Sequence, residues 1–395
     1  MSAQPSGVPA GAGLKDAAHA PVPVTIVAHD VGSVGGMERQ LAELAVGLRR
    51  FGHDVTVIAR KCVLPADSGV SFHRVRTPSR PFLLAYPCFL IAGSLAVRRL
   101  RRGIVQSTGP LVLNSIDTMA VHYCHCAYTA APERTGRAYA LYDRAVAVVE
   151  RGSEALGVRR NRAARFVCVS EGVAEEVRRC FPSVGAHVVT IHNGVDLDEF
   201  APGAGAEEGR ALRAELGIEH GALLAAFVGG DWERKGLRPA IEALALAPGW
   251  HLAVAGRGQQ RAFAELAASL GVQERVHWLG IREDVRPLYA VADAFVLPSR
   301  YETFSLVTFE AAASGLPVIA ADVNGVRELI HSGVNGYLVV PAAEPIAARL
   351  RELGADEALR SRLGAAAREA ALGFGWERMV RAHHELFEAL AAGSA

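Results

Sequence analysis

Strand-like apolar runs alternate with helix-like segments along almost the whole chain, and this alternation narrows the possible folds more than any other feature. Each run is followed by a segment with periodic Leu, Ala and Val, which is typical of an amphipathic helix. In the first half of the chain, the runs occupy residues 24–30, 53–60, 103–108, 119–125, 164–170 and 187–195. A strand–helix–strand repeat of this kind predicts a parallel sheet that is covered on both faces.

The composition changes at residues 201–210, where "APGAGAEEGR" has the character of a linker. The pattern then restarts, with apolar runs at residues 223–230, 250–256, 275–280, 292–298, 317–322 and 335–340. A chain of 395 residues is also too long for one ordinary domain. We therefore predict two doubly wound α/β domains in tandem, with a ligand cleft at the carboxyl ends of both sheets.

Charge, cysteine content and the N-terminal segment limit the class of protein. The formal net charge of +1 gives no reason to expect nucleic acid as a partner. The six cysteines are scattered, and residues 1–21 lack the apolar core of a secretory signal. We therefore predict a disordered leader and free thiols in a reducing cytoplasm. The segment "HYCHC" (122–126) has the residue types of a metal site, but alternation on a strand would divide its side chains between two faces.

A long uncharged run, "FLLAYPCFLIAGSLAV" at residues 82–97, precedes the basic "RRLRR". The run is shorter than the roughly 20 residues that span a bilayer, and Pro87 interrupts it. Our preferred interpretation is a core helix whose basic last turn suits the helix dipole. The alternative is an interfacial helix that touches anionic lipid.

Two loops that follow predicted strands could bind an anion. "VGSVGGMERQ" contains Gly32, Gly35 and Gly36 before a helix, and glycine allows the backbone to approach a ligand closely. "GGDWERKGL" places Arg234 and Lys235 where a strand passes into the next helix, and two adjacent cations can meet a diphosphate. A tight turn and a solvated charged surface are the respective structural alternatives.

The segment "SRYETFSLVTFEAAASGLPVIA" (299–320) places Glu302 and Glu310 eight residues apart after a predicted strand. A helix turns by about 100° per residue, so both carboxylates can face one crevice if Glu302 lies in the loop and Glu310 in the helix. The backbone N–H groups of Thr303, Phe304 and Ser305 would then cap a phosphate, while Glu310 accepts hydrogen bonds from vicinal hydroxyls. A diphosphate, a ribose and a hydroxylated group together describe a sugar nucleotide.

The same segment resembles the E-x7-E signature of retaining GT-B glycosyltransferases, particularly glycosyltransferase family 4. "IHNGVDLDEF" (191–200), the Arg-Lys pair, the glycine loop and "DVNGVRELIHSGVNGYLV" (322–339) resemble further segments of that family in the expected order. The resemblance implies two Rossmann-like domains. It assigns residues 22–200 to an acceptor domain, 201–372 to a donor domain and 373–395 to a helix that returns to the first domain.

The resemblance also implies a set of roles. Arg234 and Lys235 would bind the diphosphate without a metal ion or cofactor, and Glu310 would bind the ribose. Glu302 would contact the donor sugar, and Gly35 and Gly36 would approach the phosphates or the sugar from the first domain. Ile281 and Arg282 would flank the base. An active-site histidine, which is His122 or His125, would lie near the sugar. In the final helix, Trp376 and Leu386 would be packing residues.

The implied reaction moves a hexose-type sugar from a nucleoside diphosphate to a hydroxyl with retention of configuration. UDP is favoured over GDP as the donor nucleotide. The acceptor would be a cell-envelope glycan, a lipid-linked molecule or a small molecule. The protein would be cytoplasmic, with peripheral membrane contact as an option through residues 82–102. The alternatives are a non-catalytic sugar-nucleotide-binding protein and a UDP-sugar epimerase of the same fold.

Overall fold

The computed structural model describes residues 22–33, 35–127, 137–219 and 221–393. Its first half contains a 7-stranded parallel sheet. In spatial order the strands are β5 (Ser71–Arg74), β3 (Val55–Ala59), β1 (Val24–Val27), β6 (Ile104–Thr108), β7 (Thr118–Val121), β8 (Arg165–Cys168) and β9 (Val188–Thr190). The order reverses between β1 and β6, which is where open α/β sheets bind their ligands.

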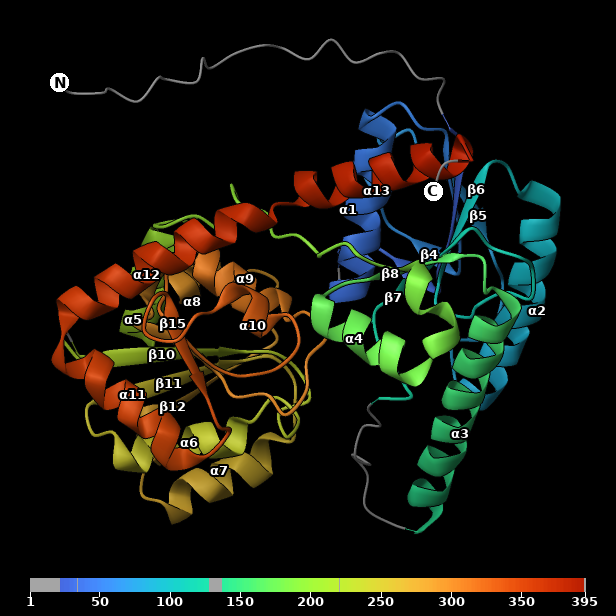
Figure 1. The fold of residues 1–395 in the computed structure, drawn as a ribbon. Coiled ribbons are helices and arrows are strands. Elements are labelled where there is room, and N and C mark those ends of the chain that lie inside the picture. Colours follow the sequence, from blue (N-terminus) through green and yellow to red (C-terminus); the bar gives the residue numbers. More distant parts are fainter. Residues whose placement is uncertain (1–21, 34, 128–136, 220, 394–395) are drawn as a thin grey trace, which may run out of the picture.

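Helices cover both faces of this sheet (Figure 1). They are α1 (Gly36–Arg50), α2 (Phe82–Leu100), α3 (Arg137–Arg160) and α4 (Glu171–Cys180), with a short 3-10 helix, η1, at Pro182–His187. Helix α1 forms because its apolar residues recur at helical spacing, which buries Leu41, Leu44 and Leu48 against the sheet. Ser170 caps α4 by accepting a hydrogen bond from the Val173 N–H.

The second half contains a 6-stranded parallel sheet. Its spatial order is β12 (Val276–Gly280), β11 (Trp250–Ala255), β10 (Leu223–Val228), β13 (Ala294–Leu297), β14 (Val318–Ala321) and β15 (Gly336–Val339). The surrounding helices are α5 (Ala206–Glu215), α6 (Leu237–Leu246), α7 (Gln260–Ser269), α8 (Arg286–Val291), α9 (Leu306–Ala313), α10 (Val326–Leu329), α11 (Ala343–Ala355), α12 (Glu357–Ala371) and the 3-10 helices η2 (Gln273–Arg275) and η3 (Leu372–Phe374).

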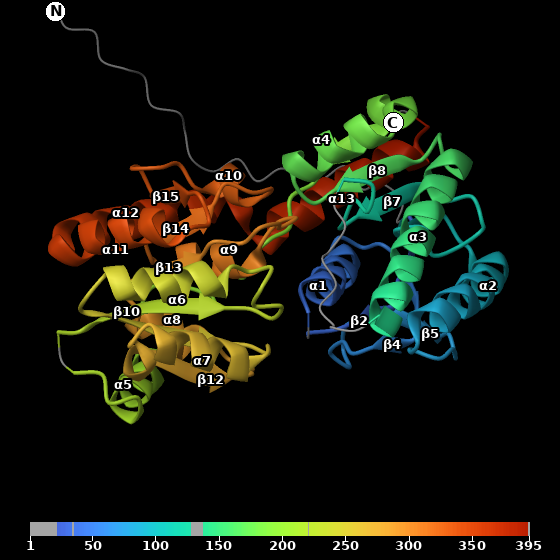
Figure 2. The ribbon, with the colours of Figure 1, turned by 90° about the horizontal axis from the view of Figure 1, so that it is seen from below.

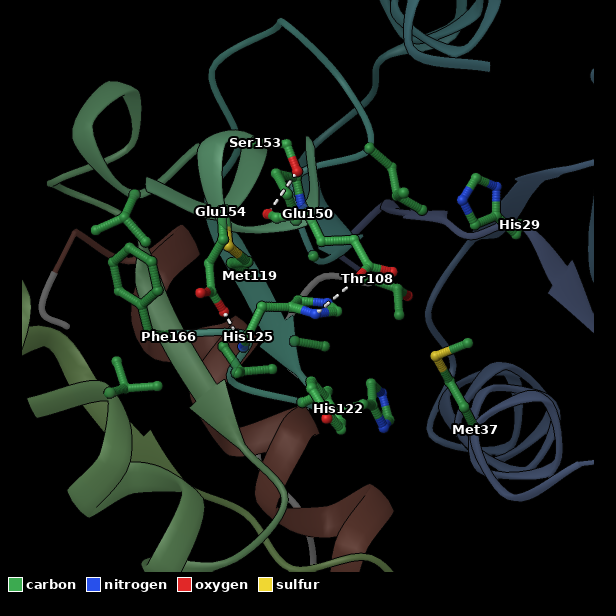
Figure 3. A pocket seen from close by; sticks show the side chains of 18 of the residues that line it. His29, Met37, Thr108, Met119, His122, His125, Glu150, Ser153, Glu154 and Phe166 are labelled. Atoms are coloured by element: carbon green, nitrogen blue, oxygen red, sulfur yellow. Dashed lines mark hydrogen bonds and ion pairs between the residues drawn. The ribbon is translucent and has the colours of Figure 1, made fainter. Parts of the chain in front are cut away.

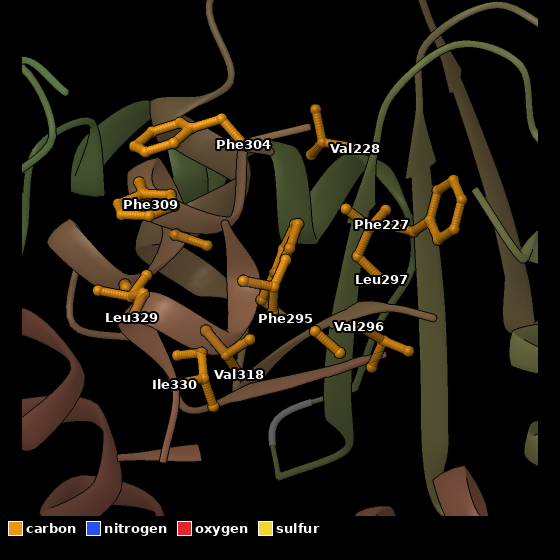
Figure 4. Packing of buried hydrophobic residues seen from close by; sticks show 14 of the residues in the cluster. Phe227, Val228, Phe295, Val296, Leu297, Phe304, Phe309, Val318, Leu329 and Ile330 are labelled. Atoms are coloured by element: carbon orange, nitrogen blue, oxygen red, sulfur yellow. The ribbon is translucent and has the colours of Figure 1, made fainter. Parts of the chain in front are cut away.

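Large apolar side chains fill the space between this sheet and its helices (Figure 4). Phe295 on β13 and Phe309 on α9 are fully buried, and Phe304 stacks on Phe309 with ring centroids 4.0 Å apart. Burial of such rings stabilises the loop between β13 and α9 as well as the sheet.

The C-terminal helix α13 (Trp376–Ala391) crosses from the second half of the molecule to the first and packs against α1 (Figures 1 and 2). Trp376 is buried there, and Leu386 is partly buried in the same cluster. The Val195 N–H donates to the Phe374 carbonyl, so the two chain segments that cross between the halves run side by side.

The two doubly wound domains are confirmed, and every predicted apolar run contains a strand of the two main sheets. Three short strands were not predicted: β5 and the pair β2 (Asp30–Val31) and β4 (Lys61–Cys62). Strand β5 lies at the sheet edge and all of its residues are exposed, so its sequence carries no apolar run. The predicted linker was too long, because α5 begins at Ala206 inside it. The predicted leader, residues 1–21, lies outside the described residues.

Helix α2 accounts for the uncharged run. By length and composition it could cross a membrane, but a third of that stretch is buried in the protein (33%). Phe89, Ala96 and Val97 pack into the core, whereas Leu84, Ile91 and Leu95 are exposed on another face. The core interpretation therefore holds for one face of the helix only.

Candidate active site

The two glutamates lie after β13, at the point where the strand order of the second sheet reverses between β10 and β13. Glu302 is in the loop and Glu310 is in α9, as predicted, and both are buried. Ser305, immediately before the helix, has a left-handed backbone with φ of 73°. Within the described part of the chain, the N–H groups of Thr303, Phe304 and Ser305 donate to no acceptor, which leaves them available to an anion.

Glu302 belongs to a buried ionic cluster with the Arg-Lys pair. Its Oε1 lies 2.7 Å from Lys235 Nζ and 3.7 Å from Arg234 Nη1, and it accepts a hydrogen bond from Ser299 Oγ at 2.8 Å. Lys235 follows β10 and Glu302 follows β13, so neighbouring strands bring them together. The family resemblance assigns Arg234 and Lys235 to the diphosphate and Glu302 to the sugar. In the structure the three side chains form ion pairs with one another.

Arg234 is held in place by further contacts. Its Nε lies 2.6 Å from Asp231 Oδ2, and its Nη1 donates to the Tyr301 carbonyl at 2.8 Å. The guanidinium therefore bridges the loop after β10 and the loop after β13. Fixed cations of this kind can stabilise a developing negative charge without reorganising.

Glu310 faces the first domain. Its Oε1 lies 3.5 Å from Nη1 of Arg39 on α1, and Nη2 of Arg39 pairs with Glu199 at 2.5 Å. Burial raises the pKa of Glu310 to about 7, while Arg39 opposes this shift. Sequence reasoning missed Arg39. Its position three residues after Gly36 was a partial signal, because the start of α1 lies near the carboxyl edge of the first sheet, where a cation can reach the cleft.

A cavity of about 880 Å³ lies at the carboxyl ends of β10, β11 and β12. Gly35 lines it from the first domain, and Ile281 and Arg282 line it from the second, so these predicted donor contacts border the same space. Gly36 lies close to α9, because an added Cβ would come within 3.2 Å of the Leu306 side chain. The Phe304 ring belongs to the core, which is compatible with the predicted role of its backbone N–H as the ligand contact.

The two candidate histidines both line a second cavity, of about 340 Å³, after β6 and β7 (Figure 3). Burial lowers the pKa of each to about 4, so both are neutral at pH 7. His122 Nε2 has no hydrogen-bond partner. His125 Nδ1 lies 3.5 Å from Glu150, and the backbone N–H of His125 donates to the Glu154 carboxylate at 3.0 Å. Both histidines therefore border the space that a ligand would enter, and the choice between them stays open.

The cysteines near these histidines do not form a metal cluster with them. Strand β7 ends at Val121, so residues 122–126 lie beyond the strand whose alternation was expected to divide them, and Cys124 is buried while Cys126 is exposed. Among the described residues, no group of three or more His, Cys, Asp or Glu side chains could hold a metal ion.

Side-chain contacts join the carboxyl ends of the two sheets. Glu328 on α10 pairs with His192 at 2.5 Å and accepts hydrogen bonds from the N–H groups of Glu171 and Gly172 at the start of α4. Glu176, also on α4, accepts a hydrogen bond from the Tyr301 hydroxyl at 3.0 Å. These contacts bind the two domains to each other beside the site, and no periodicity in the sequence indicates them.

Two family models match consecutive parts of the chain. The model described as Glycosyltransferase Family 4 matches residues 34–199, and the model described as Glycosyl transferases group 1 matches residues 209–370. An uncharacterized glycosyltransferase of Methanocaldococcus jannaschii is 31% identical over 325 residues, which is 78% of this chain and 82% of that protein.

Solved structures of glycosyltransferases share the fold. Sucrose-phosphate synthase from Thermosynechococcus elongatus superposes with a TM-score of 0.76 at 22% identity, over 94% of this chain and 100% of that one. The Anabaena protein Alr3699/HepE, in complex with UDP-glucose, gives a TM-score of 0.72 at 19% identity, over 93% and 100% of the two chains.

Proposed function

The chain belongs to the glycosyltransferases described by the group 1 and family 4 models, and from this premise we propose that it transfers a hexose-type sugar from a nucleoside diphosphate sugar to a hydroxyl, with retention of configuration. The observation that carries the proposal is the convergence, at one sheet edge, of the Arg234–Lys235–Glu302 cluster, Glu310 and three unpaired backbone N–H groups.

In this proposal, separate groups of the site bind the diphosphate, the ribose and the base of the donor. The diphosphate lies at the N-terminus of α9, where the free N–H groups and Lys235 attract negative charge. The ribose hydroxyls donate to Glu310, and the base occupies the cavity beside Ile281 and Arg282. UDP is favoured over GDP, and the similarity to a protein solved with UDP-glucose supports this choice.

The reaction breaks the bond between the sugar anomeric carbon and the diphosphate oxygen. The acceptor oxygen forms a new bond to that carbon on the same face, and its proton passes to the departing diphosphate. Arg234 and Lys235 stabilise the charge that grows on the leaving group, so no metal ion is required. His122 or His125 contributes a hydrogen bond as a neutral imidazole, because the lowered pKa of about 4 excludes the charged form of each.

Glu302 has a double role in this scheme. Before the donor binds, it neutralises Lys235 at 2.7 Å. When the diphosphate binds, it shares Lys235 with Glu302. The lone pairs of Glu302 that Lys235 no longer occupies can then accept hydrogen bonds from the sugar hydroxyls. Gly35 and Gly36 approach the donor from the opposite side without side chains.

The acceptor enters from the first domain, and it is a cell-envelope glycan, a lipid-linked molecule or a small molecule. The cavity at His122 opens between α1, α2 and α3 and is lined mostly by apolar side chains such as Met119 and Phe166 (Figure 3). The protein works in the cytoplasm, and the exposed Leu84, Ile91 and Leu95 on α2 support peripheral contact with an anionic membrane.

A panel of UDP-, GDP- and ADP-sugars tests the proposal, with slow hydrolysis and thermal shift measured together. We expect one nucleotide class to stabilise the protein and to be hydrolysed, and Lys235→Gln to lose both effects. Arg261→Gln is the matched control, because it removes an exposed cation of the same domain whose ion pair is with Glu265. Binding without turnover would identify a sensor, a changed sugar on an intact nucleotide would identify an epimerase, and no binding by any nucleotide would refute the proposal.

A further inference from the structure

A basic pocket lies beside the cleft on the first domain, outside the site described above. It has a volume of about 390 Å³. Its charged lining residues are Asp30, Arg60, Lys61, Arg74 and Arg76. Four cations and one carboxylate give the pocket a net positive charge, although the whole chain is nearly neutral. The positive charge of this pocket therefore does not come from the overall composition of the chain, and it suits an anionic ligand.

Strand pairing brings these side chains together. In the parallel ladder of β3 and β5, Ala59 lies opposite Arg74, and in the short ladder of β2 and β4, Asp30 lies opposite Lys61. Strand β2 follows β1 and strand β4 follows β3, so this short ladder lies beyond the carboxyl ends of the main-sheet strands β1 and β3. Ligands of open α/β sheets bind outside the carboxyl ends of the strands, and this pocket occupies such a position.

The positive charge of the pocket is mostly uncompensated. Asp30 is bound to Arg60 at 2.7 Å, which neutralises both. Among the described residues, Lys61, Arg74 and Arg76 form no ion pair. The Thr77 hydroxyl oxygen, which belongs to a residue lining the same pocket, is buried and has no hydrogen-bond partner. Three unpaired cations and an unsatisfied hydroxyl are the groups that bind a phosphate.

The segment between β1 and α1, which the structure describes at residues 28–33 and 35, borders this pocket and the two cavities of the site. His29 lines the cavity of the candidate histidines, Asp30 lines the basic pocket and Gly35 lines the donor cavity. The basic pocket is thus adjacent to the path of the acceptor. It is also separate from Arg234 and Lys235, the proposed diphosphate contacts, which belong to the other domain.

We propose that the basic pocket binds a phosphate group carried by the acceptor, so that the enzyme selects hydroxyl acceptors that are also phosphorylated. This inference rests on the proposed transferase function. Arg74 and Arg76 can each form a two-point contact with phosphate oxygens, and Lys61 supplies a compact charge. The phosphate anchors the acceptor and holds its hydroxyl toward the donor sugar, which lowers the entropy cost of the reaction.

The first test measures binding of glycerol 3-phosphate by calorimetry. The pocket variant carries Lys61→Gln, Arg74→Gln and Arg76→Gln. The matched control carries Arg210→Gln, Arg261→Gln and Arg362→Gln, which removes the same charge from exposed positions on the second domain, away from α2. We expect the pocket variant to bind about tenfold more weakly or worse, and the control to match the unmodified protein. Equal affinity of the two variants would overturn the inference.

A second arm separates a soluble phosphate from a phosphate on a lipid. Vesicles of phosphatidylcholine with phosphatidic acid are sedimented with each protein. If the pocket variant alone loses vesicle binding, the phosphate is lipid-borne. If both variants bind vesicles equally while only the pocket variant loses glycerol 3-phosphate, the phosphate belongs to a soluble acceptor. Both results support a phosphate site.

Donor hydrolysis, measured on the same proteins, separates this inference from the proposed function. We expect the pocket variant to hydrolyse the nucleotide sugar as fast as the control, since its substitutions do not touch the donor cluster. Failure of every protein to bind a nucleotide sugar would refute the transferase function and, with it, the acceptor role of the pocket. Intact hydrolysis with unchanged phosphate affinity in the pocket variant would refute the phosphate site alone.

Discussion

Replacing Glu302 and Glu310 separately by glutamine should have opposite effects on binding of UDP. Glutamine keeps the size of each side chain, removes the negative charge and replaces one acceptor oxygen with an NH2 donor. Glu310 is proposed to accept hydrogen bonds from the ribose, and a lost hydrogen bond to a charged group costs about 1.5–3 kcal/mol, or roughly 10- to 150-fold in affinity. Glu310→Gln should therefore weaken UDP binding by roughly that factor.

Glu302→Gln should leave UDP binding unchanged or make it tighter. In the free protein the Glu302 carboxylate lies 2.7 Å from Lys235 Nζ, and both side chains are largely buried (8% and 12% exposed). The carboxylate therefore competes with the diphosphate for this cation, and its removal leaves Lys235 to the ligand. Turnover should fall by about a hundredfold or more, because a contact to the reacting sugar is lost.

Calorimetry with UDP and steady-state kinetics with the sugar nucleotide test both variants, and thermal melting checks that they fold. Ser299 Oγ donates to Glu302 at 2.8 Å, and a glutamine carbonyl can accept the same hydrogen bond, so the loop should keep its conformation. If Glu302→Gln loses UDP affinity as severely as Glu310→Gln does, the two acids do not divide the donor in the way argued here.

Four further predictions concern metal, pH, stability and membranes. A chelator should leave turnover nearly unchanged, and loss of activity that manganese restores would contradict this. Burial raises the pKa of Glu310 to about 7, so affinity for the sugar nucleotide should rise from pH 6 to pH 8 as the carboxylate forms, and a Glu310→Gln variant that shows the same rise would refute the assignment. Phe309→Ala should lower the free energy of unfolding by about 3–5 kcal/mol in a denaturant titration, because the ring is fully buried, whereas Leu246→Ala at an exposed position should have little effect. Anionic liposomes should sediment the protein at low salt, and Ile91→Asn with Leu95→Asn should weaken this; the absence of salt-sensitive binding would restrict α2 to a role in the fold.

The predicted strands and the loop position of Glu302 were correct because they depend on local patterns. An apolar run of strand length between helical segments has few alternatives, and the helical repeat alone decides which side chains share a face. Strand β5 was missed because an exposed edge strand needs no apolar side chains. The linker was drawn too long because α5 begins with small and charged residues that also occur in loops.

The contacts within the site could not be predicted in the same way. Lys235 and Glu302 are far apart in the sequence and meet because β10 and β13 are neighbours at the reversal of strand order. Arg39 reaches Glu310 because the two domains close on one another, and the pKa of Glu310 rises because that closure removes water from the carboxylate. The resemblance of the motifs indicated which residues matter, but it carried no information on these pairings.

The sequence by itself therefore determined two parallel-sheet domains, the family to which they belong and the loops that carry the candidate residues, since each of these follows from short stretches of chain. Only the tertiary structure decided that Glu302 neutralises Lys235, that Arg39 faces Glu310 and that the exposed ends of β3, β4 and β5 form a basic pocket. Charge interactions depend on distance and on exclusion of water, and both quantities exist only after strands remote in sequence have been placed side by side.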